Sequence, residues 1–267
     1  MNKDKSNMLD KTWVRFLLRV FYLTVFVVVW QLIYRSGTFP PLLFPGGGDI
    51  LNALVKGLQG GLLDKTLYSL QVIGKGILIS TILTVVLAAL ATFSRVFEDF
   101  LYAIIVLIDP LPGIALLPLI LLWLGMGENA IIFVIIHSVL WPLLLNVFSG
   151  FKTVPPIYTE IGQNMGMNRF RLVVSVLLPS TLPQILVGFK TGWSRAWRAL
   201  ISAEMIFGAT SGKASGIGWE ISQKRNFLDV PGIFAALIVI MIIGLTVEIF
   251  LFNMIEKYTV KKWGMVT

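Results

Sequence analysis

The chain of 267 residues is strongly apolar, with 56% hydrophobic and 13% charged residues and a mean hydropathy of +0.83. A soluble domain of this length has too little interior to hide so many apolar side chains, so a lipid bilayer is the expected solvent. The formal net charge of +8 could indicate nucleic acid or an acidic partner. Much of that charge borders apolar segments, where anionic lipid accounts for it, so we expect no nucleic-acid partner.

Six apolar segments are long enough, or nearly so, to cross about 30 Å of hydrocarbon, which takes roughly 20 residues. They are residues 14–34, 70–93, 101–123, 130–150, 185–208 and 232–255. These segments lack the alternating pattern of a membrane barrel. The sequence therefore predicts an all-α membrane protein with six transmembrane helices, in a single domain over residues 1–267.

The first segment has the basic start and apolar core of a signal peptide. However, Arg15 and Arg19 precede an apolar run that reaches Tyr34, and no small-x-small cleavage site follows. It is expected to be an uncleaved first span.

The distribution of Lys and Arg predicts the orientation, because cytoplasmic loops retain these residues. With the N-terminus inside, twelve lie on the cytoplasmic side: Lys3, Lys5, Lys11, Arg15, Arg19, Arg95, Lys152, Arg169, Arg171, Lys257, Lys261 and Lys262. Six lie outside: Arg35, Lys56, Lys65, Lys213, Lys224 and Arg225. Both termini are therefore expected in the cytoplasm.

Residues 36–66, between the first two spans, are rich in Pro and Gly and include an amphipathic stretch at 49–55. We expect an interfacial helix there, capped by Asp49. The three glycines before Asp49 could cradle a phosphate, but a Walker loop needs Lys-Ser or Lys-Thr after its last glycine. None follows Gly48, and the Walker pattern occurs nowhere else, so this chain is not expected to hydrolyse ATP.

The third span contains Asp109, Pro110, Pro112, Gly113 and Pro118. Prolines and a glycine at membrane depth remove amide donors and bend or interrupt a helix, which is tolerated only against protein or water. The functional interpretation is a broken helix that lines a pathway. The alternative is a packing kink at a helix boundary.

His137, in the fourth span, is the only histidine, and there is no cysteine. A metal site is therefore not expected, and neither is a disulfide. We expect His137 to be a hydrogen-bonded residue inside the helix bundle.

The loop at residues 152–183 is a polar break between the fourth and fifth spans. Pro155 and Pro156 end the fourth helix region, residues 157–174 have helical composition, and Pro179 and Pro183 precede the next span. This pattern predicts a short helical hairpin beneath the membrane.

Within this loop, Glu160-Ile161-Gly162 is followed by Gly166 after three residues and by Val176-Leu177-Leu178-Pro179 after nine more. The spacing resembles the cytoplasmic loop signature of permease subunits from bacterial ATP-binding-cassette (ABC) importers, although Ile161 and Gly162 replace its two alanines. The resemblance implies the type I importer fold and a coupling-helix loop that contacts the nucleotide-binding ATPase. The residues expected in this coupling are Glu160, Ile161, Gly162, Gly166, Leu178 and Pro179. The alternative is a surface hairpin without a partner.

The fifth span carries Arg195, Arg198 and Glu204. A charge at the bilayer centre costs about 2.5–3.5 kcal/mol, so such residues usually face a bundle interior or water. At about 100° per residue, Arg195 and Arg198 lie roughly 60° apart on the helix, and Glu204 lies about 180° from Arg195. Their partners must therefore lie elsewhere, and three roles remain open: gating between helices, lining the route of an anionic solute, or an interfacial position.

Residues 112–127, together with Arg-Ala-Trp at 195–197 and Ala-Glu at 203–204, resemble the nitrate, sulfonate and taurine branch of these permeases. The resemblance implies a homodimer, two ATPase subunits that bind ATP and Mg, and a substrate-binding protein that docks on residues 36–66 and 209–231. It also implies a bacterial inner-membrane location and a small solute, expected to be an anion such as nitrate, taurine or another sulfonate, bicarbonate or a carboxylate. The candidate pathway or gate residues are Asp109, Pro112, Arg195, Arg198 and Glu204. The chain itself is expected to hold no cofactor.

Two other classes compete with this interpretation. An ion-coupled secondary transporter could use Asp109, Arg195, Glu204 and Glu248 as a relay, but it would not need the loop after the fourth span. A membrane-embedded enzyme finds little support, since neither a G-x-S-x-G nor an H-E-x-x-H motif occurs.

Overall fold

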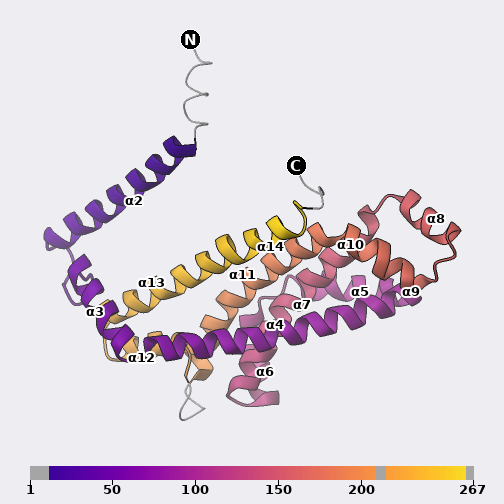
Figure 1. Cartoon of the computed structure of the whole chain (residues 1–267). Helices are drawn as coiled ribbons and strands as arrows, with labels where there is room; N and C mark the ends of the chain where they lie inside the picture. Colours follow the sequence, from indigo (N-terminus) through magenta and orange to yellow (C-terminus); the bar gives the residue numbers. More distant parts are fainter. Residues whose placement is uncertain (1–11, 209–214, 263–267) are drawn as a thin grey trace. The chain divides into compact units, whose positions relative to one another are not determined.

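The computed structural model describes residues 12–208 and 215–262, and within these residues every regular element is a helix (Figure 1). The elements of the first half are α2 (Thr12–Arg35), α3 (Gly47–Gln59), α4 (Leu62–Phe93), α5 (Arg95–Ile108), the 3₁₀ helix η1 (Gly113–Leu116), α6 (Leu117–Leu124) and α7 (Glu128–Thr153). Those of the second half are α8 (Pro156–Asn164), α9 (Arg169–Leu172), the π-helix η2 (Val173–Leu177), α10 (Leu178–Ser180), α11 (Leu182–Phe207), α12 (Ile217–Asn226), α13 (Val230–Thr246), the π-helix η4 (Val247–Phe252) and α14 (Asn253–Tyr258).

Among the described residues, four helices are long and apolar enough to cross a membrane. They are Leu17–Arg35, Leu62–Phe93, Glu128–Thr153 and the continuous run Val230–Tyr258. Two bent pairs bring the number to as many as six: Arg95–Ile108 with Gly113–Leu124, bent by 89°, and Arg169–Ser180 with Leu182–Phe207, bent by 69°. The prediction of an all-helical membrane protein is confirmed.

The segment predicted as one span at residues 101–123 is two helices. Helix α5 ends at Ile108, and the chain turns before η1 begins at Gly113. Pro110 and Pro112 lie in this turn, and neither can donate the amide hydrogen bond that would continue α5. The prolines therefore place the break at residues 109–112.

By their contacts the described residues fall into two units, residues 12–61 with 223–237 and residues 62–208 with 215–222 and 238–262. In the first unit, Trp30 of α2 stacks on Phe44 with 4.1 Å between ring centroids, and its edge meets Phe234 at 5.2 Å. Its indole N–H donates to the Pro45 carbonyl at 3.0 Å. These contacts fix the turn that leads from α2 into α3.

The expectation that Asp49 caps the following helix is wrong. Helix α3 begins earlier, with Gly46 at the N-cap, and Asp49 is the third helical residue. Its carboxylate accepts the Gly46 N–H at 3.1 Å. An acidic residue at this position also stabilises the positive end of the helix dipole, so Asp49 still favours the helix start.

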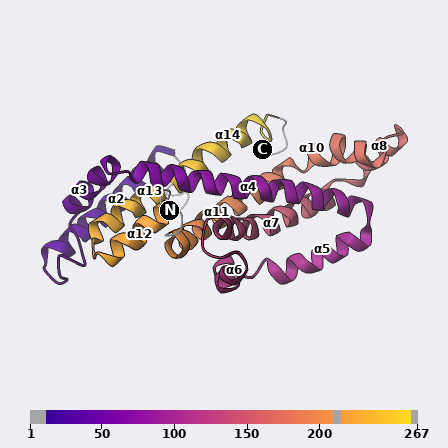
Figure 2. The same cartoon turned by 90° about the horizontal axis from the view of Figure 1, so that it is seen from below.

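Helices α4, α7 and α11 form the centre of the second unit, where they lie side by side in both views (Figures 1 and 2). Small residues mark the crossings, because Gly76 of α4 meets Ile135 and Gly192 of α11 meets Val139 with no room for a Cβ without adjustment. Close backbone approach through small residues is typical of helix packing in membranes. The core that results includes Val72, Val134, Leu143, Ala196 and Leu200, all at most 1% exposed.

Candidate functional site

Residues 154–181 form a helical hairpin, which we call the coupling hairpin. Its first arm is α8, and its second arm is α9 with η2 and α10. It lies between the end of α7 and the start of α11, at the end of the second unit where α4 passes into α5 (Figures 1 and 2). A salt bridge of 3.8 Å joins Lys152 of α7 to Glu98 of α5 at this end.

The turn of the coupling hairpin is fixed by Gly166, whose φ of +73° lies in the left-handed region that glycine adopts without strain. The Gly166 N–H donates to the Gln163 carbonyl at 2.9 Å, and the Met167 N–H donates to the Gly162 carbonyl at 3.0 Å. This pair of bonds is a Schellman motif, which ends α8 and satisfies its last carbonyls. Asn168 then caps α9 by accepting the Arg171 N–H at 2.8 Å.

Gly162 lies on the inner side of the coupling hairpin. A Cβ at this position would lie 2.5 Å from Cδ1 of Leu172, so the glycine lets the two arms approach closely. Leu172 is buried, and it fills the space that the alanine of the ABC signature would otherwise use. The departure from that signature therefore has a local packing reason.

The outer side of the coupling hairpin exposes Glu160 together with apolar residues. Ile161 is 48% exposed and Met165 is 71% exposed. Leu178, in the second arm, is also exposed but lines the cavity between the hairpin and α4, and Pro179 is partly buried. An exposed element that carries both apolar side chains and a carboxylate is typical of a protein-binding surface.

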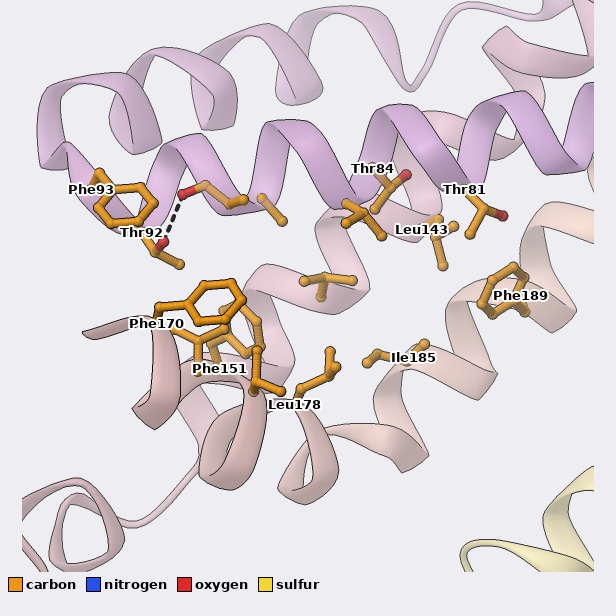
Figure 3. A pocket seen from close by; sticks show the side chains of 16 residues that line it. Thr81, Thr84, Thr92, Phe93, Leu143, Phe151, Phe170, Leu178, Ile185 and Phe189 are labelled. Carbon is orange, nitrogen blue, oxygen red and sulfur yellow. Dashed lines mark hydrogen bonds between the residues drawn. The ribbon is translucent and has the colours of Figure 1, made fainter. Parts of the chain in front are cut away.

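A cavity of about 220 Å³ separates the coupling hairpin from the helix bundle (Figure 3). Phe170 and Leu178 of the hairpin lie on one side of it, and Thr84 and Phe93 of α4 lie on the other. The hydroxyls of Thr81, Thr84 and Thr92 all donate to carbonyls of their own helix, at 2.6–2.8 Å. The lining is consequently apolar, and the hairpin is not packed solidly against α4.

The break between α5 and η1 brings together charges that are far apart in the sequence. Asp109, directly after α5, accepts a hydrogen bond from the Arg195 guanidinium of α11 at 2.5 Å. Arg195 has no partner within its own helix, and Asp109 of the interrupted third span is therefore its partner.

This pair borders a second cavity, of about 520 Å³, which we call the break pocket. Its lining consists of residues 109–114 with His137, Ser138, Arg195, Arg198 and Ala199. Of the predicted pathway residues, Asp109, Pro112, Arg195 and Arg198 line it. Ser138 was not predicted as a pocket residue, although a serine within an apolar helix is a signal for a polar site.

The expectation that His137 is hydrogen-bonded is wrong for the described residues. The side chain is 9% exposed, and neither Nδ1 nor Nε2 has a hydrogen-bond partner among them. The adjacent Ser138 hydroxyl donates to the Val134 carbonyl at 2.8 Å. His137 contacts the ring of Trp141 instead, edge to face at 6.4 Å.

Glu204 is not among the residues that line the break pocket. It is fully buried, and its carboxylate accepts the Ser69 hydroxyl at 2.7 Å and the Gly218 N–H at 2.9 Å. The Ser69 oxygen in turn accepts the Ile217 N–H at 3.0 Å. Glu204 thus joins α11 to α4 and to the N-terminus of α12, where the helix dipole favours a negative charge.

Two glycines make room for Glu204. A Cβ at Gly216 would overlap its carboxylate, and a Cβ at Gly218 would lie 2.7 Å from its Cβ. Lys65 of α4 and Glu220 of α12 form an ion pair between the same two helices. Ser69, Gly216 and Gly218 were not predicted from the sequence, although the Gly-x-Gly at 216–218, eight residues after the end of the charged fifth span, was a signal for close packing.

Among the described residues, no three His, Asp or Glu side chains are close enough together to hold a metal ion. The acidic groups of the proposed relay also lie apart: Asp109 pairs with Arg195, whereas Glu204 is bound to Ser69 and Gly218.

The helical fold, the polar loop and the charged residues within the spans define a membrane transport subunit. The sequence profile of the family described as binding-protein-dependent transport system inner membrane component matches residues 76–261, more than half of the chain. The chain therefore belongs to this family.

Its relatives include a putative ABC transporter permease protein of Methanocaldococcus jannaschii, 29% identical over 267 residues and 97% of both chains. The taurine transport system permease protein of Escherichia coli is 28% identical over 234 residues, which are 85% of this chain and 83% of that protein. The nitrate import permease protein of Synechocystis is 28% identical over 246 residues, which are 86% of this chain and 84% of that protein.

These relationships make the chain an ABC importer permease, a multi-pass inner-membrane subunit without catalytic activity. Such permeases work with ATPase subunits, where ATP binds, and with a substrate-binding protein.

Proposed function

We propose that two copies of this chain form the transmembrane route of an importer for a small anion, driven by two ATPase subunits through the coupling hairpin. The observation that carries the proposal is the exposed surface of that hairpin, to which Glu160, Ile161 and Met165 all contribute. Both termini face the cytoplasm in this proposal, and residues 1–267 form one permease domain.

Each hairpin residue has a physical task in this proposal. Glu160 pairs with a basic group of the ATPase, while Ile161 and Met165 insert into an apolar groove. Gly162 and Gly166 set the distance and the turn between the arms, since one accommodates Leu172 and the other adopts a positive φ. Leu178 and Pro179 join the hairpin to α11, so displacement of the hairpin is transmitted to that helix.

The apolar cavity behind the coupling hairpin supports this mechanism. Because it lies between the hairpin and α4, it leaves space into which the hairpin can move when the ATPase subunits close on ATP. A solidly packed contact would resist such a shift. The motion would alternate the pair of permeases between inward-facing and outward-facing states, and hydrolysis would reset it.

The break pocket is the proposed part of the solute route in each chain. It combines irregular backbone at Asp109–Pro112 with Arg195 and Arg198, and such backbone at membrane depth is tolerated where it lines a cavity. An excess of positive charge in this pocket favours an anion, as do the taurine and nitrate named in the relatives. Glu204 instead acts as an anchor that holds α12 against α4 and α11.

The substrate-binding protein is proposed to dock on the outer segments at residues 36–66 and 209–231. The first contains α3, whose Leu51 and Val55 are exposed. Residues 209–214 of the second segment lie outside the described residues.

Replacing Glu160 with lysine is expected to abolish co-purification of the ATPase with the permease, because the change puts a like charge against the partner's basic group. The variant should still insert into the membrane, since Glu160 is exposed. Tagged permease, co-expressed with its neighbouring genes, is purified in mild detergent and the bound ATPase is quantified.

Gln163→Lys, at an exposed position of the same helix, is the matched control and should retain the ATPase. Equal recovery of ATPase with both variants would contradict the assignment of Glu160. Transport by the purified permease alone under an ion gradient would instead favour a secondary transporter.

A further inference from the structure

We propose that the break pocket is a binding site for one small monovalent oxyanion, held by Arg198 and His137. The inference rests on the proposed function, because it places the solute of the importer at a named site. It also gives a role to His137, which from the sequence alone was expected only to be a hydrogen-bonded residue inside the helix bundle.

The first argument is the charge balance of the pocket. Arg195 and Asp109 neutralise each other through their hydrogen bond at 2.5 Å. Arg198 also lines the pocket, and it is exposed, with no hydrogen bond or ion pair of its guanidinium found within residues 12–208 and 215–262. With a neutral imidazole, the pocket therefore holds one uncompensated positive charge.

The second argument is the unmet hydrogen-bonding capacity of His137. Both ring nitrogens are buried and lack a protein partner across the described residues, whereas most buried polar atoms have one. A neutral imidazole carries one N–H donor and one acceptor nitrogen. An oxyanion in the pocket would accept the N–H, whereas an apolar solute would leave it unsatisfied.

Two other polar groups of the pocket have a partner within the protein. The Ser138 hydroxyl donates to the Val134 carbonyl, and one N–H of Arg195 donates to the Asp109 carboxylate. Arg198 and His137 are the polar side chains of the lining without a partner among the described residues, and we assign the solute to them. They project from α11 and α7, the two helices that pack most extensively in this unit.

Charge and geometry then define the class of ligand. A planar guanidinium presents two parallel N–H donors that match the oxygens of nitrate, a carboxylate or a sulfonate. One negative charge balances Arg198, whereas a dianion would bring a second, uncompensated charge into the membrane. The volume of about 520 Å³ admits all of these anions, so charge and not size is the selective property.

The test is equilibrium binding of radiolabelled methanesulfonate to the purified permease–ATPase complex, with nitrate and sulfate as competitors at matched ionic strength. We expect saturable binding that nitrate displaces and that sulfate displaces at least tenfold less well. Arg198→Gln should weaken binding at least tenfold, Arg198→Lys less, and His137→Leu severalfold.

Arg95→Gln, at an exposed basic residue of α5 outside both the coupling hairpin and the pocket, is the control and should bind as the wild type does. Wild-type binding by Arg198→Gln, equal competition by sulfate, or displacement by phosphatidylglycerol vesicles but not by nitrate would each overturn the inference.

Quantifying the ATPase in the same preparations separates this inference from the proposed function. A complex that retains the ATPase but binds no methanesulfonate overturns the anion site and leaves the importer assignment intact. A permease that binds the anion saturably but never recovers an ATPase supports the site and overturns the proposed coupling. Recovery of ATPase with each variant also verifies that the variant is folded.

Discussion

Glu204→Leu is expected to abolish uptake and to lower the melting temperature of the purified permease by several degrees. The change removes the acceptor for the Ser69 hydroxyl and the Gly218 N–H, both of which are buried with it. An unsatisfied buried donor costs about 1–3 kcal/mol. The expected loss is therefore a large fraction of the net stability of an ordinary domain, which is about 5–15 kcal/mol.

Two further variants separate this effect from the mere loss of a carboxylate. Glu204→Gln keeps the volume and one acceptor oxygen, so an intermediate melting temperature is expected. Glu248→Leu removes an exposed carboxylate from the last apolar run and should leave the melting temperature nearly unchanged. If all three variants melt like the wild type, Glu204 does not anchor α12.

Gly166→Val is expected to reduce ATP-driven uptake at least tenfold while the amount of permease in the membrane stays normal. A non-glycine residue in the left-handed region costs about 1–2 kcal/mol, and a β-branched side chain is disfavoured further. The Schellman turn at Gly166 would then open, and Glu160 and Met165 would be misplaced relative to the ATPase. Uptake is measured in membrane vesicles supplied with ATP and the binding protein.

Gly166→Asn is the matched control, because asparagine tolerates the left-handed region. It should retain most of the uptake. A Cβ at Gly166 meets no atom within 4 Å in the described part of the chain, so steric bulk inside this protein cannot explain a loss. If asparagine is as harmful as valine, the partner requires an empty space there, and the backbone argument is wrong.

The features that depend on the local sequence could be predicted. Apolar run length gives the membrane-spanning segments, because about 30 Å of hydrocarbon sets a minimum length. The prolines at 110 and 112 locate the break after α5, because they lack amide donors. The positions of Glu160 and Gly166 indicate the coupling hairpin, since its turn depends on nearby residues.

Contacts between distant residues could not be predicted. The helical wheel excluded a partner for Arg195 within α11 but could not select Asp109, which lies 86 residues earlier. It placed Glu204 on the opposite side of the helix from Arg195, but it could not identify the contacts of Glu204, because an angle on a helix does not reveal which neighbour packs there. The contact of Glu204 with Ser69, and the space that Gly216 and Gly218 leave for it, are seen only in the three-dimensional structure.

His137 shows the limit of a general rule. Buried polar atoms usually have partners, so a hydrogen-bonded histidine was the reasonable expectation. Its environment is instead determined by η1 and α11, which leave an open pocket beside the imidazole. Gly162 is a second residue whose environment the sequence did not reveal, since the glycine at this position is explained by the nearby side chain of Leu172.

The most direct test of the account is cross-linking from the coupling hairpin to the ATPase. The chain contains no cysteine, so Met165→Cys introduces a unique thiol at an exposed position. A reagent that joins thiols to amines, applied to membranes that contain the complex, should yield a product with the masses of one permease and one ATPase subunit. Lys56→Cys, in the segment proposed to lie outside, should yield none. Absence of the product from Met165→Cys, or equal yields from both positions, would contradict the account.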